Sequence, residues 1–178
     1  MYPEEASSAT ADEGEADTRL MYFPVSLPKL VVMSICTLGV YNIYWQFCHW
    51  LYIRDYEKAS FSPAWRGFFS IVFCYPLFRR IRRTVIAKGL PIGLSAGPLV
   101  LGWLIFALAG LLPPPFFLLY FVSTLFLLPA QNAANAINAT IDPEHDPNNK
   151  FSMWNKVAIV IGGLTVILAV VGAFLPPK

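Results

Sequence analysis

The amino-acid sequence predicts an all-α integral membrane protein, with four transmembrane helices and one re-entrant or interfacial amphipathic helix. Of the 178 residues, 56% are hydrophobic and 13% are charged, and this charged share is about half that of a typical soluble domain. Three long stretches contain no charged residue: 30–53, 89–141 and 157–177. A helix that spans a bilayer needs about 20 apolar residues, so the first and third stretches each fit one span and the second fits two.

An acidic tail is expected to precede a single helical membrane domain. Residues 1–20 are rich in acidic residues, Ala and Ser, a composition typical of disordered segments. They lack the basic and apolar regions of a cleaved signal peptide, so the first membrane helix is expected to act as the targeting signal. The membrane domain is expected to cover residues 21–178, with spans at about 28–51, 94–112, 116–130 and 155–175.

The first span is predicted from its start signals. Ser26 is a good helix N-cap, and Pro28 is tolerated in a first turn, where its missing N–H costs nothing. The helix is expected to run to about Leu51 and to continue into the polar segment YIRDYEK.

The segment from about 63 to 88 is predicted to be the re-entrant or interfacial helix. Its charge-free core, from Gly67 to Phe78, has 12 residues and rises only about 18 Å, whereas the hydrocarbon core of a bilayer is about 30 Å thick. Pro76 is expected to bend this helix.

The third and fourth spans are predicted to form an antiparallel hairpin. Pro113, Pro114 and Pro115 interrupt the apolar stretch between them, and three consecutive prolines cannot continue a helix. The fourth helix is expected to project beyond the membrane as the polar run 131–140. A loop over 142–149 then leads to the final span.

The Lys and Arg residues favour one orientation across the membrane. With four spans and a non-crossing second segment, ten of the thirteen fall on one side, which would be cytoplasmic, while Arg19, Lys29 and Lys178 fall on the other. This distribution predicts that both termini lie outside the cytoplasm. The ten are Arg54, Lys58, Arg66, Arg79, Arg80, Arg82, Arg83, Lys88, Lys150 and Lys156.

Polar side chains share one face of the first predicted span. Asn42, Gln46 and His49 are spaced i, i+4 and i+7, and residues three or four apart lie on the same face of a helix. In lipid such a face should turn toward other helices, where amides form hydrogen bonds that hold the helices together. The functional alternative is a site around His49, a titratable group near the cytoplasmic surface.

A basic cluster follows the second predicted segment. Arg79, Arg80, Arg82 and Arg83 are expected to anchor this segment at the cytoplasmic surface and to attract anionic lipid head groups. Specific binding of a lipid or phosphate is the sharper interpretation. Nucleic-acid binding is not expected, because the cluster follows a membrane-embedded stretch and no recognition module surrounds it.

Three asparagines repeat at every third position of the polar run after the fourth span. Asn132, Asn135 and Asn138 are interpreted either as residues that pack against the amphipathic segment or as a docking face for a partner. Both interpretations use one face of the projecting helix.

No pattern for a metal, a cofactor or a catalytic centre is found in the sequence. The acidic loop that begins at Asp142 lacks the glycine and the final glutamate of a calcium-binding loop. The three cysteines are scattered through apolar segments and give no metal spacing. We therefore expect neither a cofactor nor a metal.

The segment Thr37-Leu-Gly-Val-Tyr-Asn-Ile-Tyr-Trp45 resembles the T-x-G-[IV]-Y-x-[IL]-Y-W signature of small bacterial membrane proteins that are grouped as domains of unknown function. The run SPAWRGFF, which begins at Ser62, is similar to a second feature of this group, and the likeness covers about residues 24–83. The resemblance implies a multi-pass protein of the bacterial inner membrane. It brings no activity and no functional residue with it.

These patterns favour a non-enzymatic multi-pass protein that acts through helix packing, through anionic lipids, or through membrane-protein partners or further copies of itself. The alternative is a small oligomeric transporter or channel subunit, which would need an ionisable group inside the bundle; His49 is the only acid or base in the three uncharged stretches. The third hypothesis is a lipid-modifying enzyme that uses the arginine cluster to bind phosphate and His49 as a base.

Overall fold

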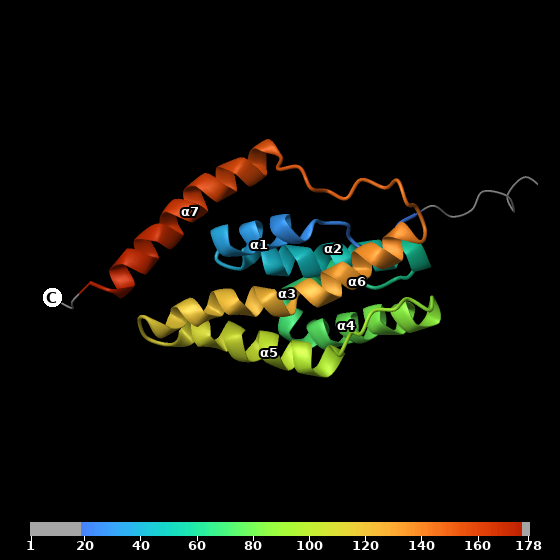
Figure 1. The fold of residues 1–178 in the computed structure, drawn as a ribbon, viewed down its shortest axis with the longest axis horizontal. Coiled ribbons are helices and arrows are strands. Elements are labelled where there is room, and N and C mark those ends of the chain that lie inside the picture. Colours follow the sequence, from blue (N-terminus) through green and yellow to red (C-terminus); the bar gives the residue numbers. More distant parts are fainter. Residues whose placement is uncertain (1–18, 176–178) are drawn as a thin grey trace, which may run out of the picture.

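The computed structural model describes residues 19–175, and this part of the chain is helical throughout its regular structure, with no strand (Figure 1). The all-α prediction is confirmed, whereas the predicted acidic tail lies almost entirely outside the described residues. The helices, with η for a 3₁₀-helix, are α1 (Leu27–Cys36), α2 (Val40–Glu57), α3 (Pro63–Phe68), α4 (Ser70–Ala87), α5 (Ala96–Leu108), η1 (Ala109–Leu111), η2 (Phe116–Phe126), α6 (Leu128–Ala139) and α7 (Met153–Ala173).

α1 and α2 form an antiparallel hairpin, so the prediction of one continuous helix over 28–51 is wrong. α1 ends at Cys36, and the chain reverses before α2 begins at Val40. In the turn, Leu38 and Gly39 have positive φ angles of 50° and 84°. Glycine adopts this left-handed conformation at no steric cost, and that freedom allows the helix to break inside an apolar stretch.

Side-chain hydrogen bonds hold the two helices of this hairpin together. The hydroxyl of Thr37 donates to Met33 O at 2.7 Å and accepts from the N–H of Tyr41 at 2.9 Å. It therefore satisfies a free backbone N–H at the start of α2. Ser34 Oγ donates to Asn42 Oδ1 at 2.5 Å between the helices.

The hairpin brings the segment before α1 to the same end of the molecule as the basic cluster. The hydroxyl oxygens of Tyr22 and Thr84 lie 2.8 Å apart, and Lys29 Nζ donates to Lys150 O at 2.7 Å. The prediction that Arg19 and Lys29 lie across the membrane from the other basic residues is therefore wrong. The chain reverses between α1 and α2, so the residues before α1 lie at the same end as those that follow α2.

α5 and η2 form a second antiparallel hairpin around the three prolines, as the sequence predicts. Gly102 lies against the ring of Phe126, where a Cβ atom would be 2.2 Å from Cε1, and the rings of Phe106 and Phe126 stack with centroids 5.5 Å apart. The predicted continuation of the fourth helix is also confirmed, because η2 and α6 form one helix, Phe116–Ala139. The first half of this helix is 3₁₀ rather than α.

The single helix predicted over 63–88 consists of two helices, α3 and α4, which are separated at Phe69. Pro76 lies inside α4. Gly67 of α3 packs closely on α2, where a Cβ atom would be 2.7 Å from Phe47 Cβ. The short α3 is thus held against α2, and α4 begins as a separate helix after the break at Phe69.

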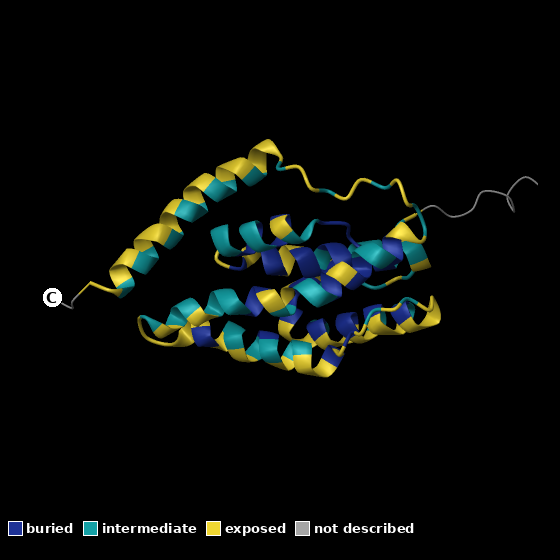
Figure 2. Cartoon of the chain, viewed as in Figure 1, coloured by how far each residue is buried: buried dark blue, intermediate teal, exposed yellow. Residues whose placement is uncertain are grey.

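The core lies between α2, α4 and α6, whose inward faces are buried (Figure 2). Trp45, Phe78, Ile81 and Leu127 are fully buried there. The rings of Trp45 and Phe78 meet edge to face with centroids 6.3 Å apart.

α7 lies outside this core. None of its residues is buried, and apolar side chains are exposed along its whole length (Figure 2). It packs on α1 at Gly162, where a Cβ atom would be 1.5 Å from Cys36 O. By length and composition, α7 and the helix Phe116–Ala139 can each cross a membrane.

Replacing Gly39 by Ala should destabilise the first hairpin. The left-handed conformation costs a non-glycine residue about 1–2 kcal/mol, and the new Cβ would lie 1.3 Å from the hydroxyl oxygen of Tyr120. The free energy of unfolding in detergent should therefore fall by more than about 1 kcal/mol. Gly97→Ala is the matched control, because nothing lies within 4 Å of a Cβ atom at Gly97. Equal losses for the two variants would contradict the proposed turn.

Candidate functional site

A groove rich in basic side chains lies where α2, α3, α4 and the segment before α1 meet. It has a volume of about 640 Å³ and combines five cations with aromatic and aliphatic groups. We call it the basic groove; its lining residues are Met21, Trp50, Arg66, Tyr75, Pro76, Arg79, Arg80, Arg83, Thr84, Ala87 and Lys88.

The helical period of α4 places Arg80 and Arg82 on different sides of the helix. Arg79, Arg80 and Arg83 line it, whereas Arg82 does not. Each residue of an α-helix turns by about 100°, so Arg82 projects roughly 160° away from Arg80 around the helix axis. The structure thus brings together three of the four arginines that the sequence analysis grouped, and adds Arg66 to them.

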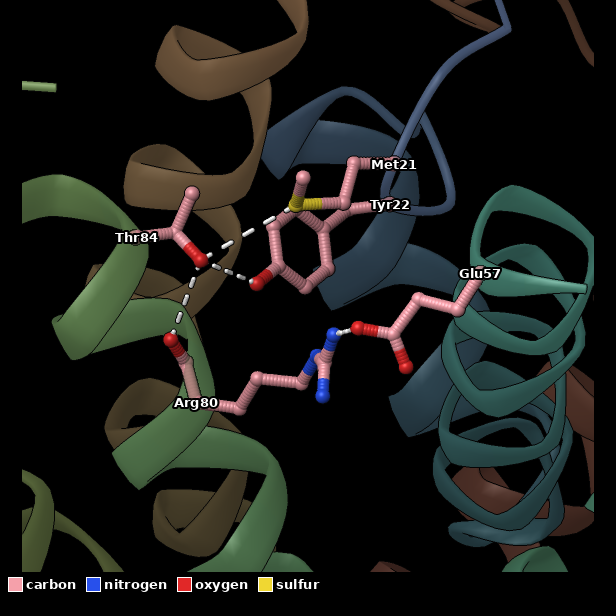
Figure 3. A network of polar contacts seen from close by, with 5 residues as sticks. All are labelled: Met21, Tyr22, Glu57, Arg80 and Thr84. Carbon is pink, nitrogen blue, oxygen red and sulfur yellow. Dashed lines mark hydrogen bonds and ion pairs between the residues drawn. The ribbon is translucent and has the colours of Figure 1, made fainter. Parts of the chain in front are cut away.

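Arg80 contacts α2 through its side chain and Thr84 of its own helix through its carbonyl oxygen (Figure 3). Its Nη2 forms an ion pair with Glu57 Oε1 of α2. Its carbonyl oxygen accepts a hydrogen bond from Thr84 Oγ1 at 3.2 Å, and the same Oγ1 lies 3.9 Å from Met21 Sδ. Burial raises the pKa of the Tyr22 hydroxyl, whose oxygen lies 2.8 Å from Thr84 Oγ1.

Arg66 reaches the basic groove from α3 and is held by aromatic rings. Its guanidinium carbon lies 3.7 Å from the ring centroid of Phe61, 4.4 Å from that of Trp50 and 5.6 Å from that of Phe73. Contacts of this kind stabilise a cation that is partly removed from water. Burial lowers the pKa of Arg66, although arginine remains charged in proteins.

The basic groove holds more positive charge than its neighbours neutralise. Among residues 19–175, Glu57 is the carboxylate that pairs with one of the five cations, while Arg66, Arg79, Arg83 and Lys88 have no carboxylate partner. Two buried N–H groups of lining residues, Trp50 Nε1 and Arg80 Nε, also have no acceptor in the described part of the chain. A ligand that supplies negative charge and several acceptor oxygens, such as a phosphate or carboxylate, fits this chemistry.

The polar face predicted on the first span is buried inside the bundle. Asn42 is 4% exposed, and Gln46 and His49 are 0% exposed. Asn42 bonds Ser34 across the first hairpin, and His49 Nε2 lies 3.1 Å from Gln131 Oε1. The carboxamide of Gln46 has no hydrogen-bond partner at either atom.

Gln131 of α6 is the centre of this buried polar network. Its Oε1 accepts from Trp45 Nε1 at 2.5 Å, and its Nε2 donates to Phe23 O at 3.2 Å and to Asn135 Oδ1 at 2.7 Å. Because Oε1 can only accept, the proton of His49 lies on Nε2, and Nδ1 is left without a partner. No carboxylate bonds this ring within the described chain, so a role for His49 as a base gains no support from its contacts.

The asparagines of α6 bind the segment before α1. Asn135 Nδ2 donates to Val25 O at 2.9 Å. Asn138 exchanges two hydrogen bonds with the backbone of Tyr22, at 2.7 and 3.1 Å, and only Asn132 of the three has an exposed side chain. Two members of the predicted docking face are therefore occupied by the chain itself.

The sequence analysis missed Gln131, although a usable signal exists. Gln131, Asn135 and Asn138 are spaced i, i+4 and i+7, the same spacing as the polar face of α2. A spacing of three along 131–140 selects Asn132 with Asn135 and Asn138, in place of Gln131. Trp50 and Arg66 carry no local signal, because only the packing of α3 and α4 on α2 brings them to the groove.

Residues 19–175 contain no group of three or more His, Cys, Asp or Glu side chains that could hold a metal ion. Comparison with protein families, curated proteins and solved structures finds no match to this chain. The resemblance of the 37–45 segment stays a prediction.

Replacing Gln131 by Met should destabilise the protein strongly. Methionine has a similar volume but leaves Trp45 Nε1 and Phe23 O buried without partners, and each buried orphan group costs about 1–3 kcal/mol. Thermal or denaturant unfolding in detergent should show a loss of at least about 2 kcal/mol. Asn132→Met, on the next residue and with an exposed side chain, should change stability by less than about 0.5 kcal/mol. Similar losses for both variants would show that the buried network contributes little.

Proposed function

We propose that the chain is an integral protein of the bacterial inner membrane that binds anionic lipid head groups in its basic groove. The observation that carries this proposal is the set of four groove cations that have no carboxylate partner among residues 19–175. They lie next to the apolar part of the molecule. The protein then acts by contact with lipid rather than by catalysis.

The exposed apolar surface supports a membrane location. α7 has no buried residue, and Val160, Ile161, Leu164 and Leu168 are each 58–71% exposed. A soluble monomer rarely exposes an apolar surface of this length. Lipid chains would cover it without any further partner.

The two hairpins and α7 suggest a revised topology. The ten residues of α1 rise about 15 Å, half of a bilayer core, so we propose that the first hairpin is re-entrant. The segments 96–111 and 116–139 would cross as a pair, and α7 would cross once. The N-terminal segment and twelve of the thirteen Lys and Arg residues then share the cytoplasmic side, in accord with the positive-inside rule.

Apolar residues next to the groove favour a lipid over a soluble anion. Trp65, Phe68, Ile71 and Val72 are each 60–70% exposed. They belong to α3 and the first turn of α4, and Tyr75 follows them into the groove lining. A head group bound by the arginines would therefore have its acyl chains beside an apolar surface.

Arg83→Gln should weaken binding of anionic lipid, and Arg82→Gln should not. Each basic residue near an anionic head group contributes about 1 kcal/mol, so affinity should fall about fivefold at low salt. Purified protein is titrated with dioleoyl phosphatidylglycerol and, separately, with neutral dioleoyl phosphatidylcholine, and binding is followed by native mass spectrometry. Equal effects of the two substitutions, or equal binding of the two lipids, would contradict a defined site.

Single-cysteine labelling tests the revised topology. In a variant with Cys36, Cys48 and Cys74 replaced by Ala, a cysteine at Leu20 should be shielded from a membrane-impermeant maleimide in intact cells. A cysteine at Leu175 should react, because α7 crosses the membrane between them. If both positions react from outside, the N-terminal segment does not share the side of the basic groove.

A further inference from the structure

We propose that the basic groove is a site for a lipid phosphomonoester, that is, an apolar chain that ends in a terminal phosphate. This inference rests on the proposed function and narrows its ligand. It follows from three features of the groove: its charge, its unused donors and its apolar edge.

The charge of the groove fits a ligand with more than one negative charge. A phosphomonoester carries about −1.5 to −2 at neutral pH and presents three strong acceptor oxygens, whereas the phosphodiester of a common lipid carries one charge. Arg66, Arg79, Arg83 and Lys88 all line the groove and have no carboxylate partner among residues 19–175. A single negative charge would leave most of this positive charge unneutralised.

Two donors of the groove lining are buried and have no acceptor among residues 19–175. They are Trp50 Nε1, in a side chain that is 3% exposed, and Arg80 Nε. A buried donor without a partner costs free energy, which a ligand oxygen would recover. Arg79 and Arg83 are one helical turn apart on the same face, close enough to bind one phosphate group.

The geometry also separates the roles of the arginines. Arg80 of α4 is tied to α2 by its ion pair with Glu57 (Figure 3), so it holds the wall of the groove in position. Arg66 is held on its aromatic rings on the opposite, α3 side. The phosphate would lie between these walls, and its chain would leave over the exposed side chains of Ile71 and Val72.

The first experiment compares three probes by native mass spectrometry of the full chain at pH 7.5. Dioleoyl phosphatidic acid should bind at least about tenfold more tightly than dioleoyl phosphatidylglycerol, and inorganic phosphate at millimolar concentration should not displace it. Equal binding of the two lipids would overturn this inference but leave the proposed function intact. Displacement by inorganic phosphate would show a site for the free ion, and failure of both lipids to bind would overturn the proposed function itself.

The second experiment removes one donor without removing its ring. Trp50→Phe keeps an aromatic surface for Arg66 but lacks the indole N–H, so it should reduce the preference for phosphatidic acid over phosphatidylglycerol by at least about threefold. Trp65→Phe is the control, because Trp65 is 63% exposed and is not a groove residue. An unchanged preference in Trp50→Phe, or an equal loss in both variants, would overturn the role assigned to this donor.

The pH dependence gives an independent readout. The charged groups that face the ligand are the five cations of the groove and Glu57, which is paired with Arg80; arginine and lysine keep their charge between pH 5 and 8. The second ionisation of a phosphomonoester lies near pH 6, so the preference for phosphatidic acid should grow as pH rises from 5 to 7.5. A preference that stays constant over this range would contradict recognition of the doubly ionised phosphate.

Discussion

The arrangement of the helices depends on one buried carboxamide, that of Gln131. A polar group in the interior must find hydrogen-bond partners. Gln131 finds them on α2, through Trp45 and His49, and on the segment before α1, through Phe23 O. Neither part of the chain can move away from α6 without leaving buried polar groups unpaired. This requirement closes the first hairpin onto the helix Phe116–Ala139.

Closure of this hairpin also gathers charged residues at one end of the molecule. Once the segment before α1 is bound to α6, Tyr22 lies beside Thr84 of α4 and Lys29 lies beside Lys150. The opposite end contains the two hairpin turns, at 37–39 and 112–115, and both turns lack charged residues. Charge and apolar surface are therefore separated along the long axis of the bundle.

The sequence predicts much of this fold because many of its signals are local. Three prolines specify the turn of the second hairpin, and the absence of charge identifies the apolar helices. The break at Gly39 could not be predicted in the same way, because a glycine in an apolar run serves equally well as a contact point between helices. The turn at Gly39 depends on hydrogen bonds that join residues far apart in the sequence. Gln131 bonds His49 and Trp45, which are 82 and 86 positions away from it.

The candidate site shows the same division between local and long-range information. The α-helical period places Arg82 roughly 160° from Arg80 around the axis of α4 but only about 60° from Arg79, so spacing accounts for part of the basic groove and not for the exclusion of Arg82 from the side of Arg79. The position of Lys88 follows from the same helix, since it lies two turns beyond Arg80. The donor of Trp50, by contrast, belongs to the groove only because α4 packs beside α2.

Arg66 shows why the break between α3 and α4 matters for the groove. In a single straight helix over 63–88, Arg66 and Arg79, 13 positions apart, would lie about 20 Å from each other along one axis, so Arg66 could not lie on a wall that faces Arg79. The break at Phe69 allows α3 to stay on α2 through Gly67 and Phe47. Arg66 then rests on Trp50 and faces the arginines of α4. The groove thus depends on the helix break at Phe69. The break at 37–39 likewise forms the hairpin that places the N-terminal segment at the edge of the groove.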